Sequence, residues 1–295
     1  MRSEAGGPIS SDKQNAATAA AVKACDGLDG VVDGVLRDPR ACAFDAHNVT
    51  LLTPGEAKAI NKIWGGSTDS ETSELLWYGI KRDASMSGLA GASPFPISVA
   101  QPKYWVYLDP AWDWQKSLSY ENYADFFDKT TKMVNPVIGT DYPDLTKFKA
   151  RGSKLVMWHG WSDQLIMPEG SIDYYNEVVR TTSSGDLNKT QDFARLFMAP
   201  GTAHCGMRTD GFFDAVVQWV EHGLAPGTVE HQVSAQTVRP LCPHPAVAVY
   251  KGTGSTDEAA NFFCGTDQAV VKDDEDAARR GNQRVFGLPF LPVQA

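Results

Sequence analysis

What the sequence lacks narrows the classes of protein that it can encode. No apolar segment approaches the roughly 20 residues that a membrane-spanning helix needs. Residues 1–19 are polar and rich in glycine and serine, without the apolar centre of an export leader. Basic runs are missing too, and the 27 basic and 36 acidic residues leave a net charge of −9, which argues against a nucleic-acid partner. The sequence therefore predicts a soluble chain with no export signal of its own.

What is present suits a globular protein. With 295 residues, of which 42% are hydrophobic, the chain can bury a core as one large domain or as a domain with a cap. It has five cysteines. Pairing Cys25 with Cys42 and Cys242 with Cys264 would close short loops, each worth about 3 kcal/mol of stability; buried free thiols are the alternative. The remaining cysteine, Cys205, indicates a partner outside this chain.

Strands and helices alternate in the second half of the chain. Apolar runs at Lys154–Trp158 and Arg195–Met198 are typical of buried strands. A helix is expected from Pro168 onward, and a second one at Phe212–Gly223, ended by its glycine. The order strand, helix, strand, helix predicts a parallel α/β sheet, whose functional loops gather at the carboxyl ends of the strands.

The first half is expected to be less regular. Thr53, Pro54 and Glu56 have the pattern of a helix start, and this helix should end at Gly65–Gly66. From about Ser67 to Asp144 the chain is dense in aromatic residues and interrupted by prolines, so we expect an irregular segment. Long irregular insertions are usually functional, which suggests a cap or lid. Aromatic residues that merely pack a loop-rich subdomain are the alternative.

Two residues on the predicted strand-end loops suit acid–base chemistry. Asp163 ends the segment W-H-G-W-S-D, and His204 lies in A-P-G-T-A-H-C. A histidine can take a proton from an alcohol near neutral pH, and a carboxylate on its far nitrogen fixes the tautomer and stabilises the imidazolium. His159 and Asp173 are the competitors, although His159 is expected to satisfy a buried hydrogen bond and Asp173 falls within the following helix.

The atom that such a pair would activate is missing. No window of the sequence reads G-x-S-x-G, the turn that exposes a nucleophilic serine. Ser67, Ser87 and Ser162 lack the flanking glycines, and Ser162 adjoins the acid itself. The sequence therefore predicts the acid and base of a hydrolase without its nucleophile.

A second site is predicted near the N-terminus. The segment C-D-G-L-D-G-V-V-D-G-V-L-R-D-P-R-A-C, residues 25–42, has three aspartates that are each followed by glycine: Asp26, Asp29 and Asp33. Their carboxylates and the backbone carbonyls of Val31 and Val35 could surround one Ca²⁺, which prefers six to eight oxygen ligands. The spacing is not that of an EF-hand. A solvated turn of aspartate and glycine is the alternative.

Taken together, the motifs resemble the tannase and feruloyl esterase family of α/β-hydrolases. They are the loop of residues 25–42, W-H-G-W-S-D, A-P-G-T-A-H-C, and the tail R-P-L-C-P-H-P-A-V-A-V-Y-K-G-T-G with N-F-F-C, between Arg239 and Cys264. The resemblance runs from about Ala21 to Gly265. It implies a Ser-His-Asp esterase with Asp163 as acid and His204 as base, a structural calcium ion in the Asp/Gly loop, and both disulfides.

The resemblance also implies what lies beyond this sequence. In the family a cysteine just before the nucleophilic serine bonds to the cysteine after the histidine, so Cys205 would be the half of a disulfide whose partner is on a missing N-terminal segment. We therefore expect a truncated chain with a partial α/β-hydrolase fold and an inserted irregular lid that carries the calcium loop. The expected parts are a remnant of the hydrolase domain at residues 1–24, the lid with its calcium loop at 25–145, and the C-terminal half of the hydrolase domain at 146–295.

The predicted function is serine-type hydrolysis of an aromatic carboxylic ester, such as a feruloyl, galloyl or terephthaloyl ester, by this chain as the C-terminal part of an esterase. A non-catalytic, calcium-stabilised fragment or binding module is the main alternative. A metal hydrolase built on His159, Asp163 and His204 is a third possibility. The full-length protein is expected to be secreted or periplasmic.

Overall fold

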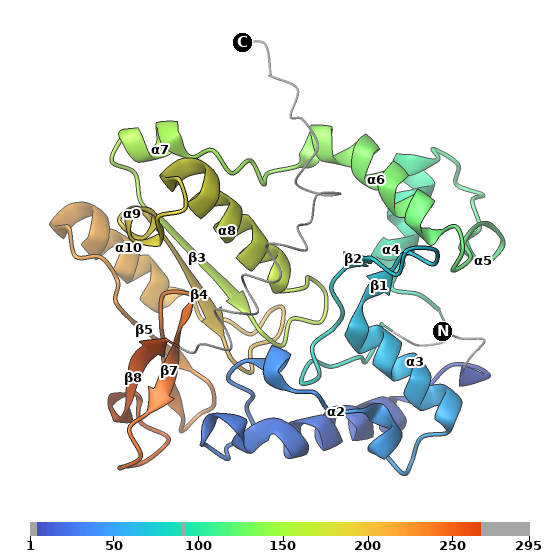
Figure 1. Ribbon diagram of the computed structural model, residues 1–295, viewed down its shortest axis with the longest axis horizontal. Helices are drawn as coiled ribbons and strands as arrows, with labels where there is room; N and C mark the ends of the chain where they lie inside the picture. The colour runs from blue at the N-terminus through green and yellow to red at the C-terminus, as the bar shows by residue number, and fades with distance from the viewer. Residues whose placement is uncertain (1–4, 90–92, 267–295) are drawn as a thin grey trace.

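A computed structural model describes residues 5–89 and 93–266 of the chain. Its second half contains a parallel pair of strands, β3 (Leu155–Gly160) and β4 (Ala194–Ala199), in register from Leu155 beside Ala194 to Gly160 beside Ala199 (Figure 1). The two predicted strands and their parallel pairing are thus confirmed. This pair carries the candidate site at its carboxyl end.

Helices cover both faces of the strand pair. Successive side chains of a strand point to opposite faces, and β4 shows this in two neighbours. Leu196 packs in one cluster with residues of α8 (Glu169–Ser183), whereas Phe197 packs in another with Phe212 of α10 (Asp210–His222). Gly223 ends α10 with a φ of 71°, as predicted. Two shorter helices, α7 (Thr146–Ala150) and α9 (Leu187–Gln191), precede β3 and β4.

The two edges of this strand pair differ. On the outer edge of β4, Phe197 bridges to Pro243, and the backbone N–H of His244 donates to the carbonyl of Leu196 at 2.7 Å. In the described part of the chain no strand pairs with the outer edge of β3, where Trp158 is 37% exposed. Among residues 5–89 and 93–266, the backbone groups on this edge of β3 therefore have no strand to pair with. This is unusual, because parallel sheets are normally buried.

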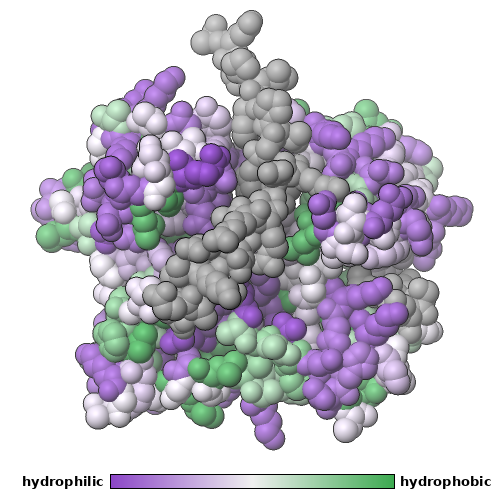
Figure 2. Space-filling view, in the orientation of Figure 1, coloured by the Kyte–Doolittle hydropathy of each residue, from purple (hydrophilic) through white to green (hydrophobic). Residues whose placement is uncertain are grey.

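The first half is built on two helices that pack together, α2 (Ser11–Cys25) and α3 (Pro54–Gly65). The predicted start of α3 is confirmed, because Thr53 and Glu56 form the reciprocal capping box, with the Glu56 N–H donating to Thr53 Oγ1 at 3.3 Å. Gly66 follows the helix with a φ of 89°. Figure 2 shows hydrophobic side chains, in green, beside hydrophilic ones, in purple, on the lower part of this face.

Residues 67–144 are more regular than predicted. Outside residues 90–92, which the structure does not describe, they form a short antiparallel pair and three helices: β1 (Ser67–Thr68), β2 (Leu75–Trp77), α4 (Pro96–Gln101), α5 (Trp114–Ser117) and α6 (Tyr123–Ile138), with a π-helical turn at Pro102–Val106. The expectation of an irregular segment is wrong for α6. Tyr123, Phe126 and Phe127 recur at helical spacing, but the surrounding aromatic residues and Pro136, inside the helix, conceal this period in the sequence.

The chain then continues into two antiparallel hairpins, β5 (Val229–Gln232) with β6 (Val238–Leu241) and β7 (Ala246–Tyr250) with β8 (Phe262–Thr266). A disulfide between Cys242 and Cys264 ties them, and a second one joins Cys25 to Cys42. Both predicted disulfides are therefore present. Four 3₁₀ turns complete the described elements, at Asp26–Asp29, Pro39–Ala41, Ala46–Asn48 and Ala259–Asn261. None of the described helices is long and apolar enough to cross a membrane.

Candidate active site

The loops that follow β3 and β4 lie against each other because their backbones approach closely. The N–H of Trp161 donates to the carbonyl of Ala199 at 2.8 Å, and the N–H of Ser162 donates to the carbonyl of Thr202 at 3.0 Å. This approach requires glycine at position 160, since a Cβ there would collide with the Thr202 carbonyl oxygen. The acid loop and the histidine loop thus form one structural unit at the end of the strand pair.

Asp163 and His204 meet at this junction. His204 Nδ1 lies 3.0 Å from Asp163 Oδ2 and 3.2 Å from Oδ1. The backbone N–H groups of Leu165 and Ile166 donate to Asp163 Oδ1 at 2.8 and 2.9 Å. Facing a carboxylate, Nδ1 carries the proton, so Nε2 of a neutral His204 is a free base; none of the described residues hydrogen bonds to it.

The surroundings keep the acid ionised. Burial alone would raise the pKa of Asp163, but the hydrogen bonds from the Ile166 and Leu165 N–H groups and the contact with His204 outweigh it, so the net pKa is lower than the ordinary value. Asp163 is 5% exposed. A carboxylate that stays charged beside an imidazole can orient the ring and stabilise its protonated form.

The two competitors have other partners. Asp173, on α8, accepts a hydrogen bond from the Tyr78 hydroxyl at 2.9 Å. His159, the buried penultimate residue of β3, lies between the Ser171 hydroxyl, at 2.7 Å from Nδ1, and the Ile166 carbonyl, at 3.1 Å from Nε2. The same Nε2 is 3.3 Å from Asp163 Oδ2. His159 is thus part of the site, because its Nε2 and His204 Nδ1 both lie close to Asp163 Oδ2.

Buried polar contacts fix the acid loop and the start of α8 to the segment after β2, and no sequence pattern predicts them. Ser162 Oγ donates to Asp83 Oδ2 at 2.7 Å, and Lys81 pairs with Glu169. Burial raises the pKa of Asp83, against the hydrogen bond from Ser162. Nothing in the K-R-D context of Asp83 marks it as a partner of a residue about eighty positions further on.

The candidate serines are not arranged as nucleophiles. The Ser162 hydroxyl already donates a hydrogen bond to Asp83. Ser67 hydrogen bonds with Tyr123, whose pKa is raised by burial against that bond. Ser87 lies on an exposed turn, where its N–H donates to Ser85 Oγ. None of the three hydrogen bonds to His204, and the missing nucleophile stays a prediction from the sequence.

In the Asp/Gly loop the aspartates face backbone N–H groups. Asp26 accepts from Asp33 and Gly34, at 3.1 and 2.9 Å from Oδ1. Two further N–H groups donate within the loop, Val31 to Asp29 and Val35 to Asp33. Among residues 5–89 and 93–266, no group of three or more His, Cys, Asp or Glu side chains is placed to hold a metal ion. Calcium binding by this loop therefore stays a prediction.

The same loop nevertheless contacts the rest of the site. Arg239 Nη2 donates to Asp33 Oδ2 at 2.6 Å, and the Arg40 guanidinium lies 4.7 Å from the ring centroid of Trp161 in the acid loop. A Cβ at Gly201 would lie 3.1 Å from Val35, so the histidine loop also passes close to it. Cys205, beside His204, is a free and exposed thiol.

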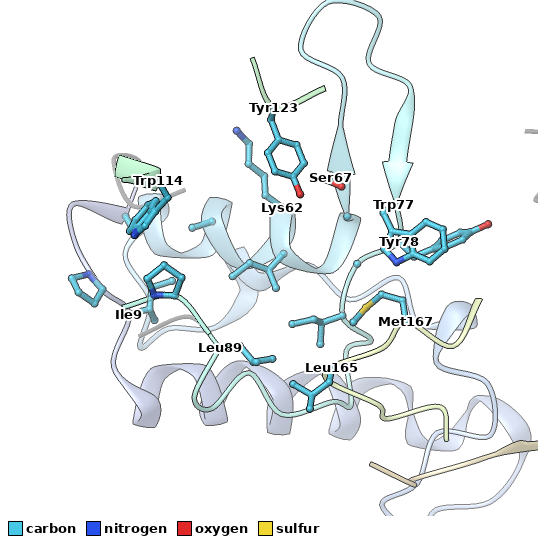
Figure 3. A pocket seen from close by; sticks show the side chains of 18 of the residues that line it. Ile9, Lys62, Ser67, Trp77, Tyr78, Leu89, Trp114, Tyr123, Leu165 and Met167 are labelled. Carbon is cyan, nitrogen blue, oxygen red and sulfur yellow. The ribbon is translucent and has the colours of Figure 1, made fainter. Parts of the chain in front are cut away.

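An apolar cavity of about 610 Å³ opens beside the acid loop. Its walls come from α3, β2, α6 and the residues that follow the acid (Figure 3). The side chains that line it include Trp77, Trp114, Tyr123, Phe127, Leu165 and Met167. Because Leu165 and Met167 lie two and four positions after Asp163, the cavity and the acid–histidine pair share one loop.

Helices cover both faces of a parallel strand pair, and an acid and a histidine lie on the loops at its carboxyl end. This is the arrangement of an α/β-hydrolase. Residues 99–265 match the family described as tannase and feruloyl esterase. That match covers more than half of the chain, which therefore belongs to this family. The resemblance seen in the four motifs is confirmed.

Individual relatives agree with this assignment. A probable feruloyl esterase from Arthroderma benhamiae is 31% identical over 280 residues, covering 84% of this chain and 51% of that protein. A mono(2-hydroxyethyl) terephthalate hydrolase from Piscinibacter sakaiensis is 29% identical over 315 residues, covering 81% and 49%. The crystal structure of an esterase from Aspergillus oryzae shares 27% identity at a TM-score of 0.76, covering 88% of this chain and 57% of the other. The chain spans about half the length of these curated relatives.

Proposed function

We propose that this chain supplies the general base and the orienting acid of a serine-type carboxylic ester hydrolase. The observation that carries the proposal is the 3.0 Å contact between His204 Nδ1 and Asp163 Oδ2, which leaves His204 Nε2 as a free base. Nε2 takes the proton of a serine hydroxyl while the serine oxygen attacks the ester carbonyl carbon. The protonated imidazole then gives this proton to the departing alcohol. In the second half of the reaction Nε2 takes a proton from water while the water oxygen attacks the acyl carbon, and it returns this proton to the serine oxygen as the carboxylic acid leaves.

The serine, in this proposal, comes from outside these 295 residues. Two features of the chain support a segment that docks beside the site. The outer edge of β3 lacks a strand among the described residues, and a strand added parallel to β3 would end next to the Asp163 loop. The exposed Cys205 thiol adjoins His204, so a disulfide to a cysteine beside the serine would hold nucleophile and base together.

The proposed substrate is an ester of an aromatic acid. The cavity beside the acid loop is apolar and lined by the rings of Trp77, Trp114, Tyr123 and Phe127, which suit the stacking of a flat aryl group. Feruloyl, galloyl and terephthaloyl esters share such a group. The two disulfides favour an oxidising compartment for the protein.

Reconstitution tests the proposal. The purified chain is mixed with the serine-bearing half of a feruloyl esterase relative, and the hydrolysis of methyl ferulate and methyl gallate is measured. We expect turnover only when both parts are present, and its loss with His204→Ala in this chain. Turnover that His204→Ala leaves unchanged would contradict the role of His204. If no combination hydrolyses an ester, the chain is instead a binding module or a non-catalytic fragment.

A further inference from the structure

We propose that His159 is a positioning residue, which holds the carboxylate of Asp163 in the orientation that His204 needs. The inference rests on the proposed function only in taking His204 as the base. It concerns a buried side chain that is neither the proposed acid nor the proposed base.

Three elements hold the imidazole of His159. The residue belongs to β3 and is 9% exposed. Its Nδ1 lies 2.7 Å from the hydroxyl of Ser171 on α8, and its Nε2 lies 3.1 Å from the carbonyl of Ile166 in the acid loop. Because strand, helix and loop each provide a contact, the ring has little freedom to turn.

These contacts determine the proton's place on the ring. Nε2 faces the Ile166 carbonyl and the carboxylate of Asp163, which both accept hydrogen bonds, so Nε2 carries a proton. Nδ1 faces the Ser171 hydroxyl, which can donate to it. His159 is then satisfied as a neutral ring, and a buried neutral ring avoids the cost of burying a charge. Its one N–H is shared between the acid and the acid's own loop.

Asp163 is consequently held from four directions. Backbone N–H groups of Leu165 and Ile166 hold Oδ1, at 2.8 and 2.9 Å. Two imidazoles hold Oδ2, His204 at 3.0 Å and His159 at 3.3 Å. The N–H groups alone fix only one oxygen, so the carboxylate could still rotate about them. The donor on His159 limits that rotation, and outer partners of this kind commonly orient a functional group.

The test reads the tautomer of His204 directly, in the chain alone, by ¹⁵N NMR of its imidazole at a pH where the ring is neutral. His159→Leu removes the donor. His159→Gln retains one, because the glutamine amide reaches about as far from the backbone as Nε2. His244→Leu is the matched control: His244 is buried to a similar degree, at 4% exposed, and packs on Tyr175. Thermal unfolding and the remaining resonances show which variants are folded.

We expect His159→Leu to lower the ratio of the Nδ1–H to the Nε2–H form of His204 about fivefold, the equivalent of one hydrogen bond of about 1 kcal/mol. His159→Gln should restore most of the ratio, and His244→Leu should leave it unchanged. An unchanged ratio in folded His159→Leu would overturn the proposal, and so would an equal fall in His244→Leu.

A second variant covers the case in which His159→Leu does not fold. Ser171→Ala removes only the hydroxyl that faces Nδ1, so the His159 ring can turn and the ratio should fall by a smaller factor, about twofold. No change in folded Ser171→Ala would then count against the proposal. Because the measurement needs no substrate, failure to hydrolyse esters would contradict the proposed function without affecting this result.

Discussion

Two aspartate-bearing loops of this chain use their carboxylates in different ways. In the acid loop, one oxygen of Asp163 accepts hydrogen bonds from backbone N–H groups, and the other oxygen faces two imidazoles. In the loop closed by Cys25 and Cys42, Asp26 accepts only backbone N–H groups, and Asp33 is shared between Val35 and Arg239. A carboxylate that faces a ring able to gain and lose a proton supports chemistry, whereas one saturated by N–H and guanidinium donors stabilises a turn.

Replacing an aspartate in one loop or in the other should differ most in its effect on kcat. In the reconstituted enzyme, Asp163→Asn should reduce kcat about 10⁴-fold, because the amide favours the wrong tautomer of His204. Asp33→Asn, which removes the charge paired with Arg239, should change kcat less than about twofold. Steady-state hydrolysis of methyl ferulate measures both. Equal losses in the two variants would show that the loops do not differ in function.

The second difference concerns stability. Replacing Cys25 and Cys42 together by serine should lower the free energy of unfolding by about 3 kcal/mol, since the unfolded chain loses a closed loop. For a chain of this size that corresponds to a fall in Tm of roughly 5–10 °C. Cys205→Ser is the control, because this thiol is free and exposed. A Tm that falls as far in the control would contradict the assignment.

Calcium is the third test, since the sequence predicts an ion where the structure shows N–H donors. If the ion binds, excess Ca²⁺ should stabilise the chain by about 2–3 kcal/mol at a hundred times its Kd, and Tm should rise accordingly. Asp26→Asn should abolish the rise, and Asp163→Asn should not. A Tm that is the same in calcium and in chelator would establish the loop as a solvated turn.

The parts of this fold that the sequence predicted are those set by local patterns. The capping box at Thr53, the apolar runs of β3 and β4, and the stop of α10 at Gly223 each depend on a few neighbouring residues. The helix α6 was missed, because aromatic residues surround its apolar face and Pro136 interrupts its end.

For the site, the sequence placed Asp163 and His204 on strand-end loops, and the parallel pairing of the strands then brought them together. It did not reveal the hydrogen bond from Ser162 to Asp83 or the contact between His159 and the acid. The first contact joins two distant segments, and no spacing rule in the sequence connects them. His159 and Asp163 are only four residues apart, but their contact depends on the turn that the chain makes after β3.

The smallest expected effect is a dependence of stability on pH. The pKa of Asp163 in the folded chain lies below the ordinary value of 3.8, so the ionised carboxylate stabilises the fold. That stabilisation is complete at pH values well above 3.8 and is lost as pH falls through the lower, folded pKa. Asp163→Asn removes it, so wild type and variant should differ by about 1 kcal/mol in free energy of unfolding at neutral pH, and this difference should shrink below pH 4. Urea unfolding between pH 3 and pH 7 measures the difference. A gap that widens on acidification would mean that burial, rather than the N–H groups of Leu165 and Ile166 and the ring of His204, dominates the environment of the acid, and the contrast with a carboxylate that only stabilises a turn would then fail.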